Sequence, residues 1–69
     1  MTLKTKLEQA RRHVFEGKRI VAKQRSLIAK KRAGGLDTST AEKLLIQFER
    51  SLAIFEADLL AIEKAKNSN

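Results

Sequence analysis

Two segments of this sequence repeat apolar residues at alternating spacings of four and three, and a pair of glycines, Gly34-Gly35, separates the segments. Such spacing places one apolar stripe along one side of an α-helix, which is typical of a helix packed on another helix. The stripe of the first segment consists of Leu3, Leu7, Ala10, Val14, Gly17, Val21, Gln24 and Ile28, and that of the second of Ala41, Leu45, Phe48, Leu52, Phe55, Leu59 and Ile62.

The residues between the two stripes are those that end one helix and begin the next. Glycine adopts the left-handed conformation that closes a helix, and Asp37 and Ser39 are alternative N-caps for the second helix. Ser39 is followed three residues later by Glu42, as in a capping box. Because the linker GGLDT is short, the two helices must be antiparallel neighbours.

We therefore predict an all-α fold, an antiparallel two-helix hairpin of the coiled-coil type with helices over about residues 2–33 and 39–66. Residues 1–69 form one domain, with a polar tail over residues 67–69. A chain of this length is near the lower limit for a single hydrophobic core, and it contains no cysteine that could add a disulfide. Dimerisation into a four-helix bundle is the remaining common route to stability.

A charged stripe follows each apolar stripe by one residue; it is basic in the first segment and acidic in the second. These positions face each other across an antiparallel helix pair. Each exposed ion pair contributes only about 0.2–1 kcal/mol, so such pairs set orientation and register more than stability. The predicted structural ion pairs are Arg32 with Glu42, Arg25 with Glu49, Lys18 with Glu56 and Arg11 with Glu63.

Apolar residues also occupy positions of the second helix that point away from the helix interface. A hairpin cannot bury both faces by itself, so these residues indicate a second interface, formed by a homodimer or by docking on another protein. The predicted protein interface consists of Phe15, Ile46, Ala53, Ile54, Ala57, Leu60 and Ala61. The leading functional hypothesis is a small interaction protein, acting as a homodimer or as an adaptor or regulator of a larger protein.

The net charge of +7 is concentrated in the first half of the chain. Residues 1–33 contain eleven Lys and Arg and two Glu, giving +9, whereas residues 34–69 contain four Lys and Arg and six Asp and Glu, giving −2. Four of these basic residues share one exposed face of the first helix: Arg12, Arg19, Lys23 and Lys30.

This basic face supports the alternative hypothesis, a nucleic-acid-binding modulator that contacts phosphates. The chain has no Tyr or Trp to stack on bases and no helix-turn-helix motif, so a solvated face is the simpler interpretation. Attraction to anionic lipid is a third and weaker hypothesis, because the basic face lacks an adjacent face of large apolar residues.

No pattern in the sequence indicates an enzyme. His13 has no paired nucleophile or second metal ligand, so we expect a structural role, such as a hydrogen bond to Asp58. There is no Gly-rich phosphate loop, and a hairpin offers no concave cleft for a small-molecule substrate. We therefore predict no catalytic residues, no cofactor and no metal site.

Two residues of the apolar stripe are unusual for a helix interface. Gly17 leaves space that Phe55 can fill, although a hinge is the alternative. Gln24 is a polar residue of the kind that fixes register, with its amide bonded to a backbone carbonyl or to its counterpart in a dimer.

The N-terminal sequence is charged and has no signal-peptide hydrophobic region, and no apolar run is long enough to span a membrane. We therefore expect a cytoplasmic protein without a membrane partner. A mitochondrial-type presequence is a weaker alternative, because Glu8 and Glu16 lie within the basic stretch.

Residues between Arg12 and Asp58, about two thirds of the chain, carry a recognisable pattern. Its most specific parts are Glu16-Gly17, Gln24 and the segment Gly35-x-Asp37-Thr38. The other matching residues are His13, Val14, Arg19, Ile28, Ala41, Leu44, Leu45, Phe48 and Leu52. This pattern resembles a family of small, functionally unassigned helical-hairpin proteins common in bacterial genomes. The resemblance implies a helical hairpin and supplies no activity.

Overall fold

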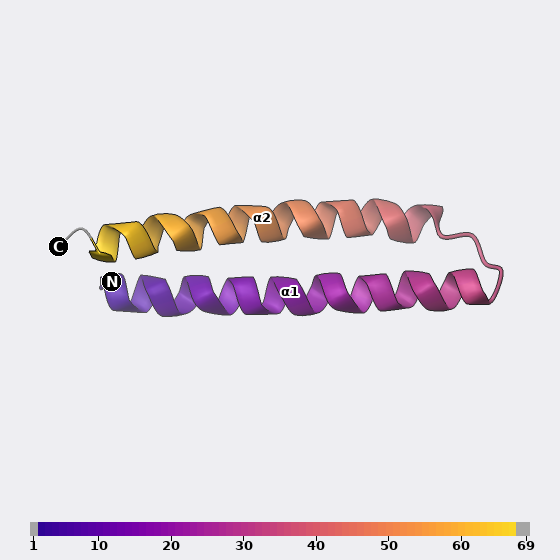
Figure 1. Cartoon of the computed structure of the whole chain (residues 1–69), viewed down its shortest axis with the longest axis horizontal. Coiled ribbons are helices and arrows are strands. Elements are labelled where there is room, and N and C mark those ends of the chain that lie inside the picture. Colours follow the sequence, from indigo (N-terminus) through magenta and orange to yellow (C-terminus); the bar gives the residue numbers. More distant parts are fainter. Residues whose placement is uncertain (1, 68–69) are drawn as a thin grey trace.

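The computed structural model describes residues 2–67 of the chain. Helix α1 comprises Leu3–Ala33 and helix α2 comprises Ser39–Asn67. The helices lie side by side and antiparallel, so the start of α1 and the end of α2 are at the same end of the molecule (Figure 1). The predicted two-helix hairpin is confirmed, with helix bounds within one residue of those expected. Asn67 of the predicted polar tail ends α2, and residues 68–69 lie outside the described part.

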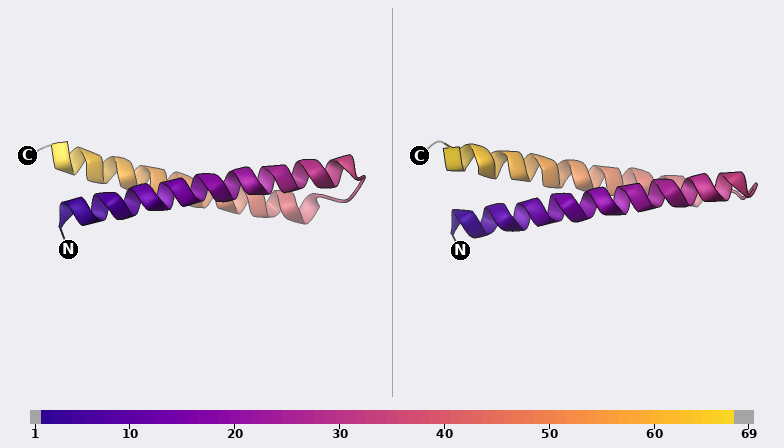
Figure 2. Two further views of the ribbon diagram at one scale, coloured as in Figure 1. Left: turned by 90° about the horizontal axis from the view of Figure 1, so that it is seen from below. Right: turned by 60° about the horizontal axis from the view of Figure 1, so that its bottom comes forward.

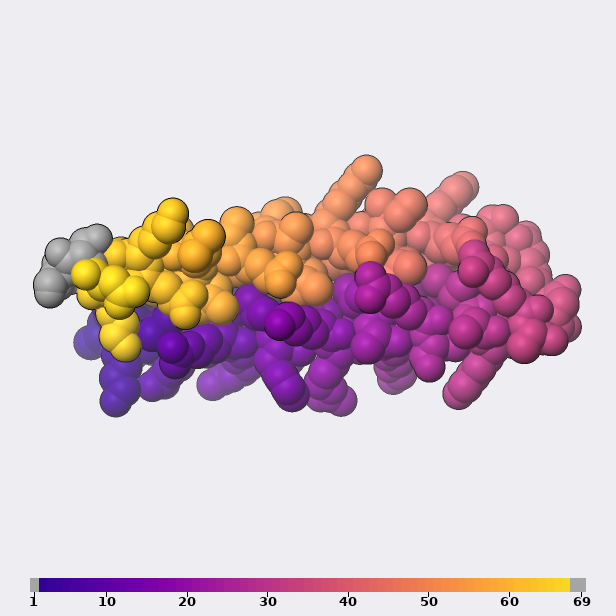
Figure 3. Space-filling model, viewed as in Figure 1, coloured from indigo at the N-terminus to yellow at the C-terminus, as the bar shows by residue number. Residues whose placement is uncertain are grey.

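The hairpin is long and thin, with dimensions of 54 × 17 × 14 Å. The two helices cross at a shallow angle (Figure 2), as expected for helices that pack through a 4-3 apolar repeat. Side chains project from both helices along the length of the body (Figure 3). Within residues 2–67, neither helix has an apolar stretch that could cross a membrane.

The turn after α1 is built from backbone hydrogen bonds that only a left-handed residue allows. The N–H of Leu36 donates to the carbonyl oxygen of Lys31 at 2.9 Å, and the N–H of Gly35 donates to that of Arg32 at 3.0 Å. These two bonds form a Schellman motif, and Gly35 has the positive φ of 73° that the motif requires. The glycine pair therefore ends α1 as the sequence predicts.

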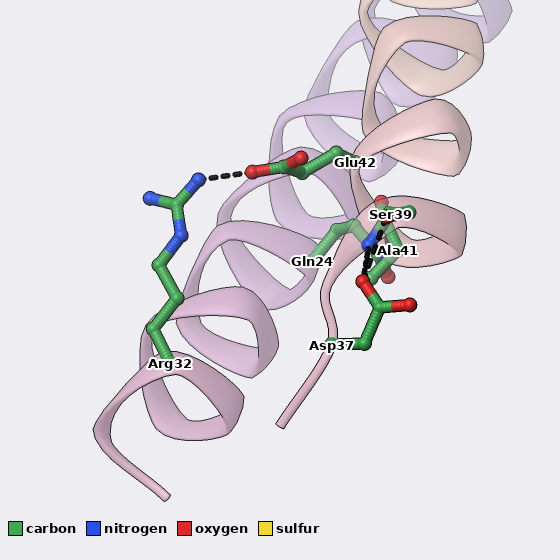
Figure 4. A network of polar contacts seen from close by, with 6 residues as sticks. All are labelled: Gln24, Arg32, Asp37, Ser39, Ala41 and Glu42. Carbon is green, nitrogen blue, oxygen red and sulfur yellow. Dashed lines mark hydrogen bonds and ion pairs between the residues drawn. The ribbon is translucent and has the colours of Figure 1, made fainter. Parts of the chain in front are cut away.

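The start of α2 is fixed by Asp37. Its Oδ1 atom accepts hydrogen bonds from the backbone N–H of Ser39 at 3.0 Å and from the Ser39 hydroxyl at 2.7 Å (Figure 4). The Ser39 hydroxyl, followed by the Ser39 N–H, lowers the pKa of Asp37 below its ordinary value of 3.8. Of the two predicted capping side chains, that of Asp37 bonds the first helical N–H, although the Thr38 carbonyl accepts the first helical bond and Thr38 thus occupies the N-cap position. The Glu42 carboxylate pairs with Arg32 instead of completing a capping box.

The interface between α1 and α2 is formed by the predicted apolar stripes, but the two helices contribute to it unequally. Seven positions of the α1 stripe are buried, whereas in α2 only Ala41 of the predicted set is buried and the others are half-buried. Leu52 and Phe55 of α2 lie against Gly17 of α1, and both side chains are half-buried. The buried residues of α1 are Leu7, Ala10, Val14, Gly17, Val21, Gln24 and Ile28, while Leu3 is half-buried.

Candidate protein-interaction surface

Gly17 allows the two helices to approach closely in the middle of the hairpin. A Cβ atom added at Gly17 would lie 3.0 Å from Leu52 Cδ1 and 3.7 Å from Phe55 Cδ2. The sequence predicts that Phe55 fills this space, and the structure shows that Leu52 fills it more closely. Gly17 is therefore a packing residue of the interface.

One flank of the interface carries charged residues from both helices. Arg25 Nη2 lies 2.7 Å from Glu49 Oε2, and Arg32 forms an ion pair with Glu42 (Figure 4). The side chains of Arg25 and Glu49 are 61% and 42% exposed, so water screens the pair. We call this flank the ion-pair face.

The structure corrects the predicted series of four ion pairs. Lys18 and Glu56 line the same groove as the Arg25–Glu49 pair, but within residues 2–67 they form no ion pair, and neither do Arg11 and Glu63. The attraction between exposed charges is close to the entropic cost of fixing two long side chains. Both of the predicted pairs that form, Arg25–Glu49 and Arg32–Glu42, lie in the half of the hairpin nearer to the turn.

The opposite flank of the interface is apolar. The ring of His13 packs on Phe55, with the ring centroids 5.1 Å apart and a tilt of 39°. Toward the turn, Ile20 and Leu27 of α1 line a groove of about 670 Å³ together with Phe48 of α2. We call this flank the aromatic face and define it by His13, Ile20, Leu27, Leu44, Phe48 and Phe55.

Three aliphatic side chains of the aromatic face remain open to solvent although they border the helix interface. Ile20 is 47% exposed, Leu27 is 42% exposed and Leu44 is 41% exposed. Leu44 lies one helical turn before Phe48 on α2 and so belongs to the same row of side chains. The hydrophobic core of the hairpin is therefore incompletely covered on this flank.

The predicted hydrogen bond between His13 and Asp58 is wrong. The two residues line one shallow pocket with Ala10 and Ile62, but no hydrogen bond joins them in the part of the chain that the structure describes. The His13 ring packs on Phe55 instead, because the aromatic ring offers a large apolar surface beside the small Gly17.

The residues of the predicted protein interface are all exposed; the six on α2 share the outer side of that helix, and Phe15 lies apart from them on α1. Phe15, which is 63% exposed, follows Arg11 by one helical turn and so adjoins the basic stripe. Ile46 and Leu60, which are 49% and 54% exposed, follow members of the acidic stripe in the same way. Ile54, which is 67% exposed, lies toward the other flank. The exposed alanines of this set are Ala53, Ala57 and Ala61.

Sequence reasoning missed the aromatic face as a candidate surface. Ile20 and Leu27 border the apolar stripe of α1 and are seven residues apart, and the sequence predicts that they widen the stripe and that Leu27 lies near Leu44. Their exposure depends on how much of each side chain α2 covers. The signal that could have revealed them is the presence of apolar residues on one flank of both stripes, opposite the charged flank.

The basic face of α1 is exposed along its length. Its four residues form no ion pair in the described part of the chain, and Glu16 lies beside Arg19 and Lys23 on the same surface. No group of three His, Asp or Glu residues among residues 2–67 is arranged to hold a metal ion. The residues of this face are Arg12, Arg19, Lys23 and Lys30.

Comparison of the chain with protein-family models, curated proteins and solved structures gives no match. The resemblance to the family of unassigned helical-hairpin proteins therefore stays a prediction. The proposed function is therefore based on the fold and the surfaces of the hairpin.

Proposed function

We propose that this chain is a non-enzymatic helical interaction protein that works by packing on another protein surface, and that it self-associates. The observation that carries this proposal is the aromatic face, where Ile20, Leu27 and Leu44 remain more than two fifths exposed beside an incompletely covered core. An adaptor or regulator that docks on a larger protein would use the same kind of surface.

The energetics of a small hairpin support association. Complete burial of a leucine, isoleucine or phenylalanine side chain contributes about 1.5–3 kcal/mol, and of these side chains in the described residues only Leu7 and Ile28 are buried. A single core in a chain of this length barely offsets the conformational entropy lost on folding. A partner that covers the half-buried residues of α2 would supply the missing apolar contacts.

Light scattering at a series of protein concentrations, with an apolar fluorescent dye added in parallel, tests this proposal. Self-association predicts a mass above the 7.8 kDa of one chain and little dye binding. A 7.8 kDa species that binds the dye strongly would favour an adaptor that waits for a different partner. A stable monomer that binds no dye would contradict the proposal in both forms.

A second candidate function is binding of nucleic acid through the basic face of α1. The supporting observation is that Arg12, Arg19, Lys23 and Lys30 are all exposed and none forms an ion pair within residues 2–67. If all four contact phosphates, log K should fall with log salt with a slope of about −3 to −4. Fluorescence anisotropy with duplex and hairpin RNA at increasing salt would measure the slope. Undetectable binding at low salt would exclude this function.

A further inference from the structure

We propose that a second copy of this chain packs on the aromatic face, so that each α1 lies against α2 of the other copy. This inference rests on the proposed self-association and adds which face is used and how the two copies are oriented. The aromatic face consists of His13, Ile20, Leu27, Leu44, Phe48 and Phe55, as defined above.

The solvent-accessible surface of the hairpin is larger than that expected for a compact protein of the same mass. It measures 5441 Å², whereas a compact protein of 7.8 kDa exposes about 4,400 Å². A stable interface between two proteins removes roughly 800 Å² from each partner, and a flank 54 Å long and 17 Å wide offers roughly that area. A second hairpin has the same length and would cover the flank from end to end.

The distribution of charge selects the aromatic face over the ion-pair face. A partner on the ion-pair face would remove water from Arg25 and Glu49, whose side chains are 61% and 42% exposed, and desolvation of such a pair opposes association. On the aromatic face, the position between Phe48 and Phe55 in the α2 row is the small Ser51.

Toward the chain ends this flank also carries charge, because Asp58 and Lys6 line the pocket beside His13, so the apolar contact lies in the half nearer to the turn. The other polar groups of the aromatic face are compatible with burial or lie at its margin. The amide of Gln24 already donates a hydrogen bond of 2.9 Å to the carbonyl oxygen of Ala41. Lys23 and Lys30 line the outer side of the groove, where charged groups of an interface stay in contact with water.

The charges of the two helices determine the orientation. Residues 1–33 carry a net charge of +9 and residues 34–69 a net charge of −2, so contact between two copies of α1 would bring like charges together. When α1 instead faces α2 of the other copy, every helix has antiparallel neighbours of complementary charge. This arrangement places Leu27 of one copy against Leu44 of the other.

Sedimentation equilibrium of two matched leucine variants of α2 tests the choice of face. Leu44→Lys introduces a charge on the aromatic face, and Leu60→Lys introduces the same charge beside the ion-pair face. Leucine and lysine have similar helix propensities, so both variants should keep their helical circular dichroism. We expect Leu44→Lys to raise the dimer dissociation constant by about 100-fold and Leu60→Lys to change it by less than about 3-fold.

Leu27→Lys provides a second variant of the aromatic face, on the other helix. Dissociation of Leu27→Lys and Leu44→Lys with retained helicity supports the inference. If one of these two variants unfolds, the dimer dissociation constants of the other and of the milder Leu44→Ala test the inference. The inference is overturned if the dimer dissociates only in Leu60→Lys, in all three lysine variants, or in none of them. Each of these results leaves self-association intact. A wild-type chain that sediments as a 7.8 kDa monomer at every concentration overturns both.

Discussion

Gln24 of α1 donates a hydrogen bond of 2.9 Å from its side-chain Nε2 atom to the backbone carbonyl oxygen of Ala41 in α2 (Figure 4). Gln24 is only 9% exposed, so its amide would be costly to bury without this partner. The bond joins the last third of α1 to the first turn of α2 and holds the two helices in one register. Gln24, a polar residue in the apolar stripe, thus fixes the alignment of α1 with α2.

Two substitutions of Gln24 should distinguish its contribution to the stability of the hairpin from its contribution to the alignment of the two helices. Gln24→Ala removes the hydrogen bond and leaves a cavity, and we expect the free energy of unfolding to fall by about 1–3 kcal/mol. Gln24→Leu fills the space with apolar atoms, and we expect a change below about 1 kcal/mol together with a less uniquely aligned helix pair. Urea denaturation measures the first effect, and the dispersion of amide NMR signals reports the second. Equal destabilisation by both substitutions would contradict this role.

Gly17 should tolerate alanine but not valine. Alanine raises helix propensity by about 1 kcal/mol, and its Cβ would lie 3.0 Å from Leu52 Cδ1, the end of a flexible, half-buried side chain that can move. We therefore expect Gly17→Ala to stabilise the hairpin by about 0.5 kcal/mol and Gly17→Val to destabilise it by about 1–3 kcal/mol. Thermal melts of the two variants would test this. If Gly17 is instead a hinge without close packing, Gly17→Val should also raise the melting temperature, because valine has a higher helix propensity than glycine.

The ion-pair face offers a matched pair of double-mutant cycles. The Arg25–Glu49 pair is formed at 2.7 Å, whereas Lys18 and Glu56 line the same groove without pairing. Alanine cycles should give a coupling energy of about 0.5 kcal/mol for Arg25 with Glu49 that decreases in 1 M salt, and a value near zero for the Lys18–Glu56 cycle. Equal coupling in both cycles would mean that all the stripe positions interact alike, as the sequence alone suggests.

Asp37 should make the stability of the hairpin depend on pH in the acidic range. Because hydrogen bonds from Ser39 lower its folded-state pKa below 3.8, its contribution is fully present above 3.8 and is lost as the pH falls through the lowered value. Asp37→Ala should be less stable than wild type at neutral pH, and the difference should shrink toward about pH 2. Asp37→Asn keeps a side-chain oxygen acceptor and serves as the control without this titration. Thermal melts over this range would refute the prediction if the difference were constant.

Local patterns in the sequence were sufficient to predict the two helices and their interface. The 4-3 spacing identifies each buried position of α1, because helix periodicity alone decides which side chains lie on one side. The glycine pair and Asp37 mark the turn through conformational preferences that act over a few residues. For the same reason the helix bounds agree with those expected.

The surfaces of the hairpin were harder to predict because they depend on contacts between helices. The sequence places Lys18 opposite Glu56, but whether the side chains meet depends on an energy balance of a few tenths of a kcal/mol. The burial of Leu27 and Leu44 depends on how far the side chains of the opposite helix extend across the interface. Sequence periodicity places Leu27 near Leu44 but does not encode how far they are covered, so their exposure is known only from the structure.

The most direct test of self-association through the aromatic face is an isotope-filtered NOE experiment on a dimer mixed from labelled and unlabelled chains. This experiment detects only contacts between copies. We predict intermolecular cross-peaks between the methyl groups of Leu27 in one copy and Leu44 in the other. Intermolecular cross-peaks confined to Ile46 and Leu60, or no intermolecular cross-peaks at high protein concentration, would contradict the account.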